Sequence, residues 1–124
     1  MFGLAALTLC VTAGRPVAQT LDGSWSGSGF VKPTSGQRER VRCRVSYSRQ
    51  SAKVYGVSAR CASASATLRQ TGELLKIRAN LYVGDFYNAQ FDFRGRIRVV
   101  VSGRTQRVTL SGDGASGSLR LRKR

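Results

Sequence analysis

Residues 37–47 read QRERVRCRVSY, and their alternating pattern is the strongest indication of the fold. Its apolar side chains take every second position, at Val41, Cys43, Val45 and Tyr47. The positions between carry four basic residues, Arg38, Arg40, Arg42 and Arg44. Successive side chains of a β-strand point to opposite faces, so this period of two predicts a strand. One face belongs to a core, and the other is a row of guanidinium groups.

The next segment continues the same period and predicts a hairpin. Tyr55, Val57, Ala59 and Cys61 share one parity, after a loop at residues 51–53. The pairing that keeps apolar residues together places Cys43 directly opposite Cys61, close enough for a disulfide. The same pairing places Arg44 opposite Arg60. Because like charges directly opposed destabilise a sheet, either the two side chains splay into water or an anion lies between them.

The remaining sequence alternates in the same way and shows no helical period. We expect hairpins at Thr71-Gly72 and at Gly84–Phe86, which would turn Leu75, Ile77 and Tyr87 toward the core and set Arg78 opposite Asp92. Turns are expected at 103–106, where Val99 would pair with Leu110, and at 112–115. Short strands joined by short loops predict an all-β fold. Residues 21–124 are therefore expected to form one domain, an antiparallel up-and-down barrel of about eight short strands. A barrel of this size is either filled by side chains or holds one small ligand.

Residues 1–20 differ from the rest of the chain. The run FGLAALTLCVTA is apolar, carries no charge before Arg15 and has the length of a secretory signal core, too short to span a bilayer as a helix. We expect a signal peptide, with a lipid anchor on Cys10 as the alternative. The expected location is periplasmic or secreted, with no transmembrane span after removal of the signal. An oxidising compartment suits the predicted disulfide.

The charge balance is extreme and predicts an anionic partner. Lys and Arg total 21 against six Asp and Glu, giving +15, and histidine is absent. Guanidinium groups suit bidentate contact with phosphate or carboxylate. The candidate anion-binding residues fall into two predicted patches, the first comprising Arg40, Arg42, Arg44 and Arg60 and the second Arg94, Arg96 and Arg98.

The two ends of the chain resemble a known group. Gly23-Ser24-Trp25 at the start of the first strand, with arginines in the last strand, resembles the calycin superfamily of lipocalins, avidins and small bacterial protease inhibitors. The resemblance implies that Gly23 and Trp25 close one barrel end and that Arg120 or Arg122 packs over the indole. The WSGSG start and RCRVSY strand are also similar to small exported proteobacterial proteins of unassigned function.

The residues argue against catalysis and for binding. No histidine is present to act as a base, no metal-ligand set is expected, and no cofactor is predicted. We therefore expect a non-catalytic exported protein that binds an anionic envelope component, namely lipid, lipopolysaccharide or an acidic protein. The first alternative is a calycin-type protease inhibitor or lipophile carrier. The second is a nucleic-acid-binding module in which Tyr55, Tyr82 and Tyr87 stack on bases, a partner against which the expected export argues.

Overall fold

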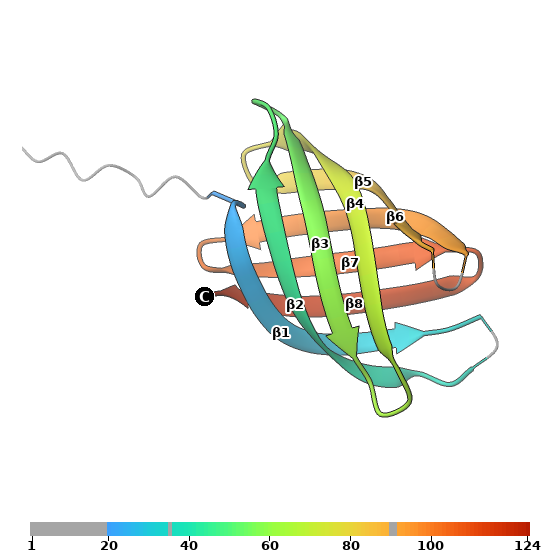
Figure 1. Cartoon of the computed structure of the whole chain (residues 1–124). Coiled ribbons are helices and arrows are strands. Elements are labelled where there is room, and N and C mark those ends of the chain that lie inside the picture. The colour runs from blue at the N-terminus through green and yellow to red at the C-terminus, as the bar shows by residue number, and fades with distance from the viewer. Residues whose placement is uncertain (1–19, 35, 90–91) are drawn as a thin grey trace, which may run out of the picture.

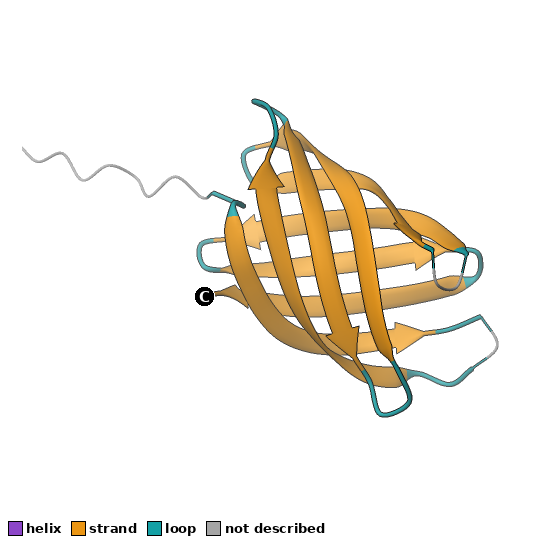
Figure 2. Ribbon diagram, viewed as in Figure 1, coloured by secondary structure: helices purple, strands orange, loops and turns teal. Residues whose placement is uncertain are grey.

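The computed structural model describes residues 20–34, 36–89 and 92–124, and they form a closed antiparallel barrel (Figure 1). Its strands are β1 (Gly23–Lys32), β2 (Glu39–Arg49), β3 (Val54–Ala62), β4 (Thr67–Arg78), β5 (Leu81–Asn88), β6 (Phe93–Ser102), β7 (Thr105–Gly112) and β8 (Ala115–Lys123). Each strand pairs with the next, and β8 closes the barrel against β1. Figure 2 shows strands and loops without a helix across the described residues. The predicted up-and-down barrel of about eight strands is confirmed.

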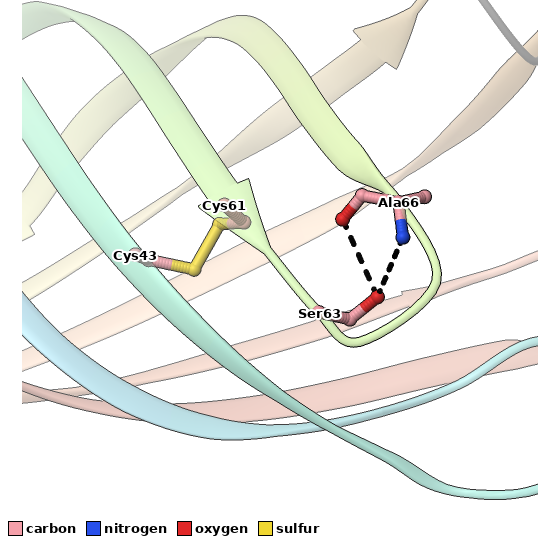
Figure 3. The surroundings of a disulfide bond; sticks show 4 residues. All are labelled: Cys43, Cys61, Ser63 and Ala66. Atoms are coloured by element: carbon pink, nitrogen blue, oxygen red, sulfur yellow. Dashed lines mark hydrogen bonds between the residues drawn. A yellow bond between two sulfur atoms is a disulfide. The ribbon is translucent and has the colours of Figure 1, made fainter.

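The hairpin of β2 and β3 has the predicted register. Cys43 lies opposite Cys61 and forms a disulfide with it (Figure 3), their Cα atoms 4.1 Å apart. In the same register Arg44 lies opposite Arg60. Figure 3 also shows the turn that follows, where the Ser63 hydroxyl oxygen accepts the backbone N–H of Ala66 at 3.2 Å. The apolar alternation and the cysteine pair therefore select the same pairing.

Two predicted hairpins are wrong, because the glycines at those positions lie inside strands. Gly72 pairs with Phe86 in the middle of β4 and β5, and Gly84 pairs with Leu74. A side chain at either glycine would collide with the backbone of the neighbouring strand. These glycines therefore mark close strand approach, not turns. The true turns lie at residues 63–66 and 79–80.

The displaced turns reverse the expected faces of β4. Leu74 is buried, whereas Leu75 and Ile77 are 47% and 50% exposed. The expected pair of Arg78 and Asp92 does not form, since Arg78 faces Leu81. The prediction of which residues face the core used hydrophobicity alone. That criterion cannot choose a face for β4, because leucines occupy both its even and its odd positions.

The second half of the barrel follows the predicted parity with a shifted register. Ile97, Val99 and Val101 are buried on β6, and Arg94, Arg96 and Arg98 on the other parity are exposed. A tight turn at Gly103-Arg104 pairs Val99 with Val108, two residues away from the expected partner. Leu119 and Leu121 of β8 point into the core, as predicted.

The two ends of the barrel differ. One end is filled by large side chains: Leu21, Trp25, Tyr47, Tyr55 and Tyr82 are all buried. Tyr55 and Tyr82 pack edge to face with ring centroids 5.2 Å apart. The other end, where the 63–66 and 113–114 turns lie, opens onto a cavity. The side chains thus make a barrel with one filled end and one mouth.

The predicted signal segment lies almost wholly outside the described residues, as does Cys10. Among the residues that the structure describes, no helix has the length and apolar character needed to cross a membrane.

Candidate functional site

The outer face of β1 is a strip of small residues between two rows of arginine. Ser26 lies between Arg44 of β2 and Arg122 of β8. Ser28 lies between Arg42 and Arg120 in the same way. We call this arrangement the β1 trough: its floor is Ser26 and Ser28, and its walls are Arg42, Arg44, Arg120 and Arg122. Figure 1 shows β1 curving between β2 and β8.

The trough is hollow because its floor has short side chains and its walls long ones. A hollow of about 710 Å³ is lined by Ser26, Arg42, Arg44, Arg60 and Arg124, among others. A second hollow, of about 390 Å³, includes Arg38, Arg40, Arg107 and Arg120 in its lining. Both hollows include Ser28. Together they cover both sides of β1, so cations surround the strip.

The outer face around the trough carries no carboxylate side chain. The six acidic residues of the sequence are Asp22, Glu39, Glu73, Asp85, Asp92 and Asp113. None occupies an outward position of β8, β1, β2 or β3: Asp22 precedes β1, Glu39 accepts a hydrogen bond from Ser65 at 2.7 Å, and the others lie elsewhere. The positive charge of the trough is therefore not neutralised by acidic side chains of the protein.

The row of opposed arginines is longer than the sequence predicted. Arg60 faces Arg44 on one side and Arg69 on the other, so three guanidinium groups lie on neighbouring strands. At strand spacings near 4.8 Å, like charges in such a row repel one another. An anion bound beside them would relieve that repulsion.

The two predicted arginine patches lie on different sides of the barrel. Arg94, Arg96 and Arg98 are on β6, four strands from β2 in either direction. The Arg96 Nε lies 3.9 Å from the Asp85 carboxylate, and Arg94 lies 5.0 Å from the Tyr87 ring centroid. Two of the three β6 arginines thus have partners within the protein. Among the described residues, no such ion pair or ring contact involves the four arginines of the trough walls.

The first patch gains residues that sequence reasoning assigned elsewhere or missed. One of Arg120 and Arg122 was expected over Trp25, yet both are exposed walls of the trough. Arg38, Arg107 and Arg124 also line the two hollows, and none of them was among the candidate anion-binding residues. The signal that could have found them is barrel closure itself, because closure places the outward arginines of the last strand beside the first strand.

The Trp25 end is packed, but a different cation approaches the indole. Trp25 is fully buried, and its Nε1 donates a hydrogen bond to the Leu21 carbonyl at 2.9 Å. The Lys123 Nζ lies 5.7 Å from the indole, and the Lys123 side chain also passes Gly23. Lys123 shares the inward parity of Leu119 and Leu121, whereas Arg120 and Arg122 point outward. Because Lys123 points inward and the two arginines point outward, Lys123 rather than an arginine lies near the indole.

The mouth of the barrel holds a cavity of about 440 Å³. Its apolar lining includes Val41, Leu68, Phe86, Phe93 and Leu110, and its polar lining includes Glu39, Gln70 and Asn88. Cavities of this size and composition fall in the range that small molecules occupy in proteins. The barrel is therefore not filled at this end.

Buried tyrosines at the packed end have altered acidity. Tyr47 donates a hydrogen bond to Gln106 at 2.5 Å, and burial raises its pKa well above the ordinary value. Burial, with Tyr55 and Asp22 nearby, raises the pKa of Tyr82 to about 12. Both side chains belong to the core rather than to a cleft. They are structural groups at the filled end.

The aromatic side chains proposed to stack on bases are not grouped on the surface. Tyr55 and Tyr82 are buried, and Tyr87 is 41% exposed on β5, contrary to its expected inward parity. Nor do the described ranges 20–34, 36–89 and 92–124 contain three His, Cys, Asp or Glu grouped to hold a metal ion.

Comparisons with known proteins show the fold. No family model matches the sequence, and no curated protein matches it significantly. A redesigned β-barrel, mFAP1, bound to DFHBI, aligns with a TM-score of 0.69 at 10% identity over 86% of this chain and 97% of its own. A de novo designed fluorescence-activating β-barrel aligns with a TM-score of 0.65 at 16% identity, covering 86% and 96%. A second redesigned barrel bound to DFHBI, mFAP0, gives a TM-score of 0.71 at 10% identity, covering 83% and 98%. The chain is a small eight-stranded antiparallel barrel, and its likeness to calycins stays a prediction.

Proposed function

We propose that this protein is exported and acts without catalysis, binding an anionic component of the cell envelope through outward arginines. The candidate ligands are anionic lipid, lipopolysaccharide or an acidic protein. The observation that carries the proposal is the β1 trough, in which four arginines flank two serines and no acidic residue takes an outward position on the surrounding strands. Unneutralised guanidinium groups gathered in a hollow favour phosphate and carboxylate ligands.

The proposal also accounts for the charge of the chain. Repulsion among cations lowers stability unless something compensates for it. Arg44, Arg60 and Arg69 stand in one row across three strands, which is an unfavourable arrangement for a barrel with no ligand. A bound anion turns that arrangement into a favourable one.

Binding to vesicles tests the proposal. Each basic side chain near an anionic bilayer contributes about 1 kcal/mol. The double variant R44Q/R122Q should therefore bind vesicles of anionic lipid, or lipopolysaccharide, about 30-fold more weakly than the parent protein at physiological salt. The matched control K53Q/R78Q removes two cations outside the trough and should change binding much less.

Two results would contradict this function. One is absence of binding to vesicles, lipopolysaccharide and acidic proteins even at low salt. The other is an equal loss in R44Q/R122Q and K53Q/R78Q, which would mean that net charge alone governs association.

A second candidate function is carriage of a small lipophile, and the mouth cavity favours it. The cavity of about 440 Å³ has an apolar lining with a few polar groups. The similar barrels mFAP1 and mFAP0 were solved bound to DFHBI. Protease inhibition, the other calycin activity, has no comparable observation behind it.

An environment-sensitive apolar dye tests carriage. The parent protein should take up the dye with saturable fluorescence, and Leu68→Arg, which places a charge in the cavity lining, should abolish uptake. Ile77→Arg places the same charge on an exposed outer position and serves as the control. Dye uptake unaffected by Leu68→Arg would exclude the mouth as the site.

A further inference from the structure

We propose that the ligand of the β1 trough is a linear anionic glycan, laid along β1 with its charged groups against the two arginine walls. The inference rests on the proposed function and narrows its ligand to one class. Such a ligand is a sugar chain that bears phosphate, sulfate or carboxylate groups at regular intervals.

The spacing along the strand suits a repeating chain. Outward residues of a strand recur every second position, which is about 7 Å. The trough consists of two successive cross-strand sets, first Ser26 with Arg44 and Arg122 and then Ser28 with Arg42 and Arg120. Phe30 with Arg40 extends the series at the mouth end, and Ser24 extends it at the other end, where its carbonyl accepts the Arg124 N–H at 2.9 Å. From Ser24 to Phe30 the site is about 20 Å long, since strands rise about 3.4 Å per residue.

The width across the strand suits one chain. The two walls stand on β2 and β8, two strand spacings apart, which is about 10 Å. A single sugar chain fits between arginine side chains at that separation and can reach the floor. A flat bilayer surface would touch the tips of the walls and leave the serines uncovered.

The floor offers the groups that sugars use. Serine hydroxyls both donate and accept hydrogen bonds, as sugar hydroxyls do. Ser26 and Ser28 are half-buried between longer side chains, so a ligand must enter the trough to reach them. Guanidinium forks on either side pair bidentately with phosphate, sulfate or carboxylate. The combination suits a ligand that carries both hydroxyls and negative charges.

The surroundings do not favour single-stranded nucleic acid. Such ligands are held by successive aromatic platforms on which bases stack. Around the trough, the exposed aromatic in the described residues is Phe30, and the Arg38 guanidinium already lies 3.9 Å from its ring centroid. One partly covered ring does not provide a series of stacking surfaces.

Heparin-derived oligosaccharides of two to twelve sugars test the inference by calorimetry at physiological salt. Affinity should rise steeply with length and level off once the chain reaches about 20 Å, the length of the trough at the strand rise given above. The variant S26E/S28E, which places carboxylates on the floor, should bind the longest oligosaccharide at least tenfold more weakly. The control S58E/T71E adds the same two charges at adjacent outward positions of β3 and β4 and should have a smaller effect.

Folding of each variant is checked by thermal unfolding, and R42Q/R120Q provides a test that leaves the floor unchanged. It too should lose at least tenfold in affinity. Vesicle binding that depends on the trough, combined with oligosaccharide binding that does not vary with length, would overturn the glycan inference and leave the proposed function standing. Tighter binding of an oligothymidylate of equal charge would also overturn it. No binding of any anion would overturn both.

Discussion

Loss of the Cys43–Cys61 disulfide should destabilise the barrel by about 3 kcal/mol. The bond joins residues 18 positions apart on adjacent strands. A cross-link of that length removes loop-closure entropy from the unfolded chain, and the chain-entropy relation gives about 3 kcal/mol for a closed loop of this size. For a domain of about 100 residues, that loss lowers Tm by more than about 10 °C.

The assay is urea unfolding of the oxidised protein, the same protein reduced with a phosphine, and the double variant C43A/C61A. The comparison of oxidised with reduced protein isolates the bond, because no side chain is lost. The double variant should be at least as unstable as the reduced protein, since Cys43 is buried and its sulfur also packs in the core. A loss below about 1 kcal/mol on reduction would show that the cross-link does not stabilise the barrel by restricting the unfolded chain.

Three further predictions concern the core, β1 and the tyrosines. Leu74→Ala should cost about 2–5 kcal/mol in unfolding free energy because Leu74 is buried, whereas Leu75→Ala should cost under about 1 kcal/mol. Urea unfolding measures both, and a larger loss for Leu75→Ala would mean that Leu75, not Leu74, faces the core. Gly27→Ala should lower Tm, because a Cβ there collides with the Arg120 carbonyl, while Gly36→Ala meets only ordinary contacts and should not. The free energy of unfolding should fall as pH rises above about 10, because tyrosine ionises there in the unfolded chain while Tyr47 and Tyr82 stay protonated in the folded barrel. Each of the two tyrosines should contribute a loss of up to about 1.4 kcal/mol per pH unit. Tyrosinate absorbance should show Tyr47 and Tyr82 ionising only as the protein unfolds, and ionisation of both side chains near pH 10 in the folded protein would contradict this.

The sequence predicts the fold class and the strand faces wherever only one parity is apolar. Val41, Cys43 and Val45 alternate with arginine, so their burial follows from charge alone. The same holds for Ile97 and Val99 on β6. A cysteine pair then determines the register of β2 and β3, because only one pairing satisfies both constraints.

The failures occur where local signals are ambiguous. Leu74 and Leu75 are adjacent, and hydrophobicity cannot decide which one is buried; packing across the barrel does. Gly72 and Gly84 have the composition of turn residues, yet they lie where neighbouring backbones approach closely. That crowding depends on the curvature of the closed barrel, which cannot be predicted from a short stretch of sequence.

Only part of the candidate site can be predicted from the sequence, because the rest also depends on closure of the barrel. Arg42 and Arg44 follow from the alternation of one strand. Their partners Arg120 and Arg122 lie far away in the chain and become neighbours only when β8 pairs with β1. Without closure, the calycin likeness places one of those two arginines at the Trp25 end, where Lys123 lies instead.

The most direct test of the β1 trough maps the ligand onto the barrel by NMR. Arginine Nε–H and backbone N–H signals are followed while an anionic oligosaccharide is added to isotope-labelled protein. The largest shifts should fall on the residues of the trough, namely Ser26, Ser28, Arg42, Arg44, Arg120 and Arg122. Signals of Arg96 and Arg98 on β6 should move little. Largest shifts on β6 or in the mouth cavity, with the β1 signals unchanged, would contradict the assignment of the trough as the binding site.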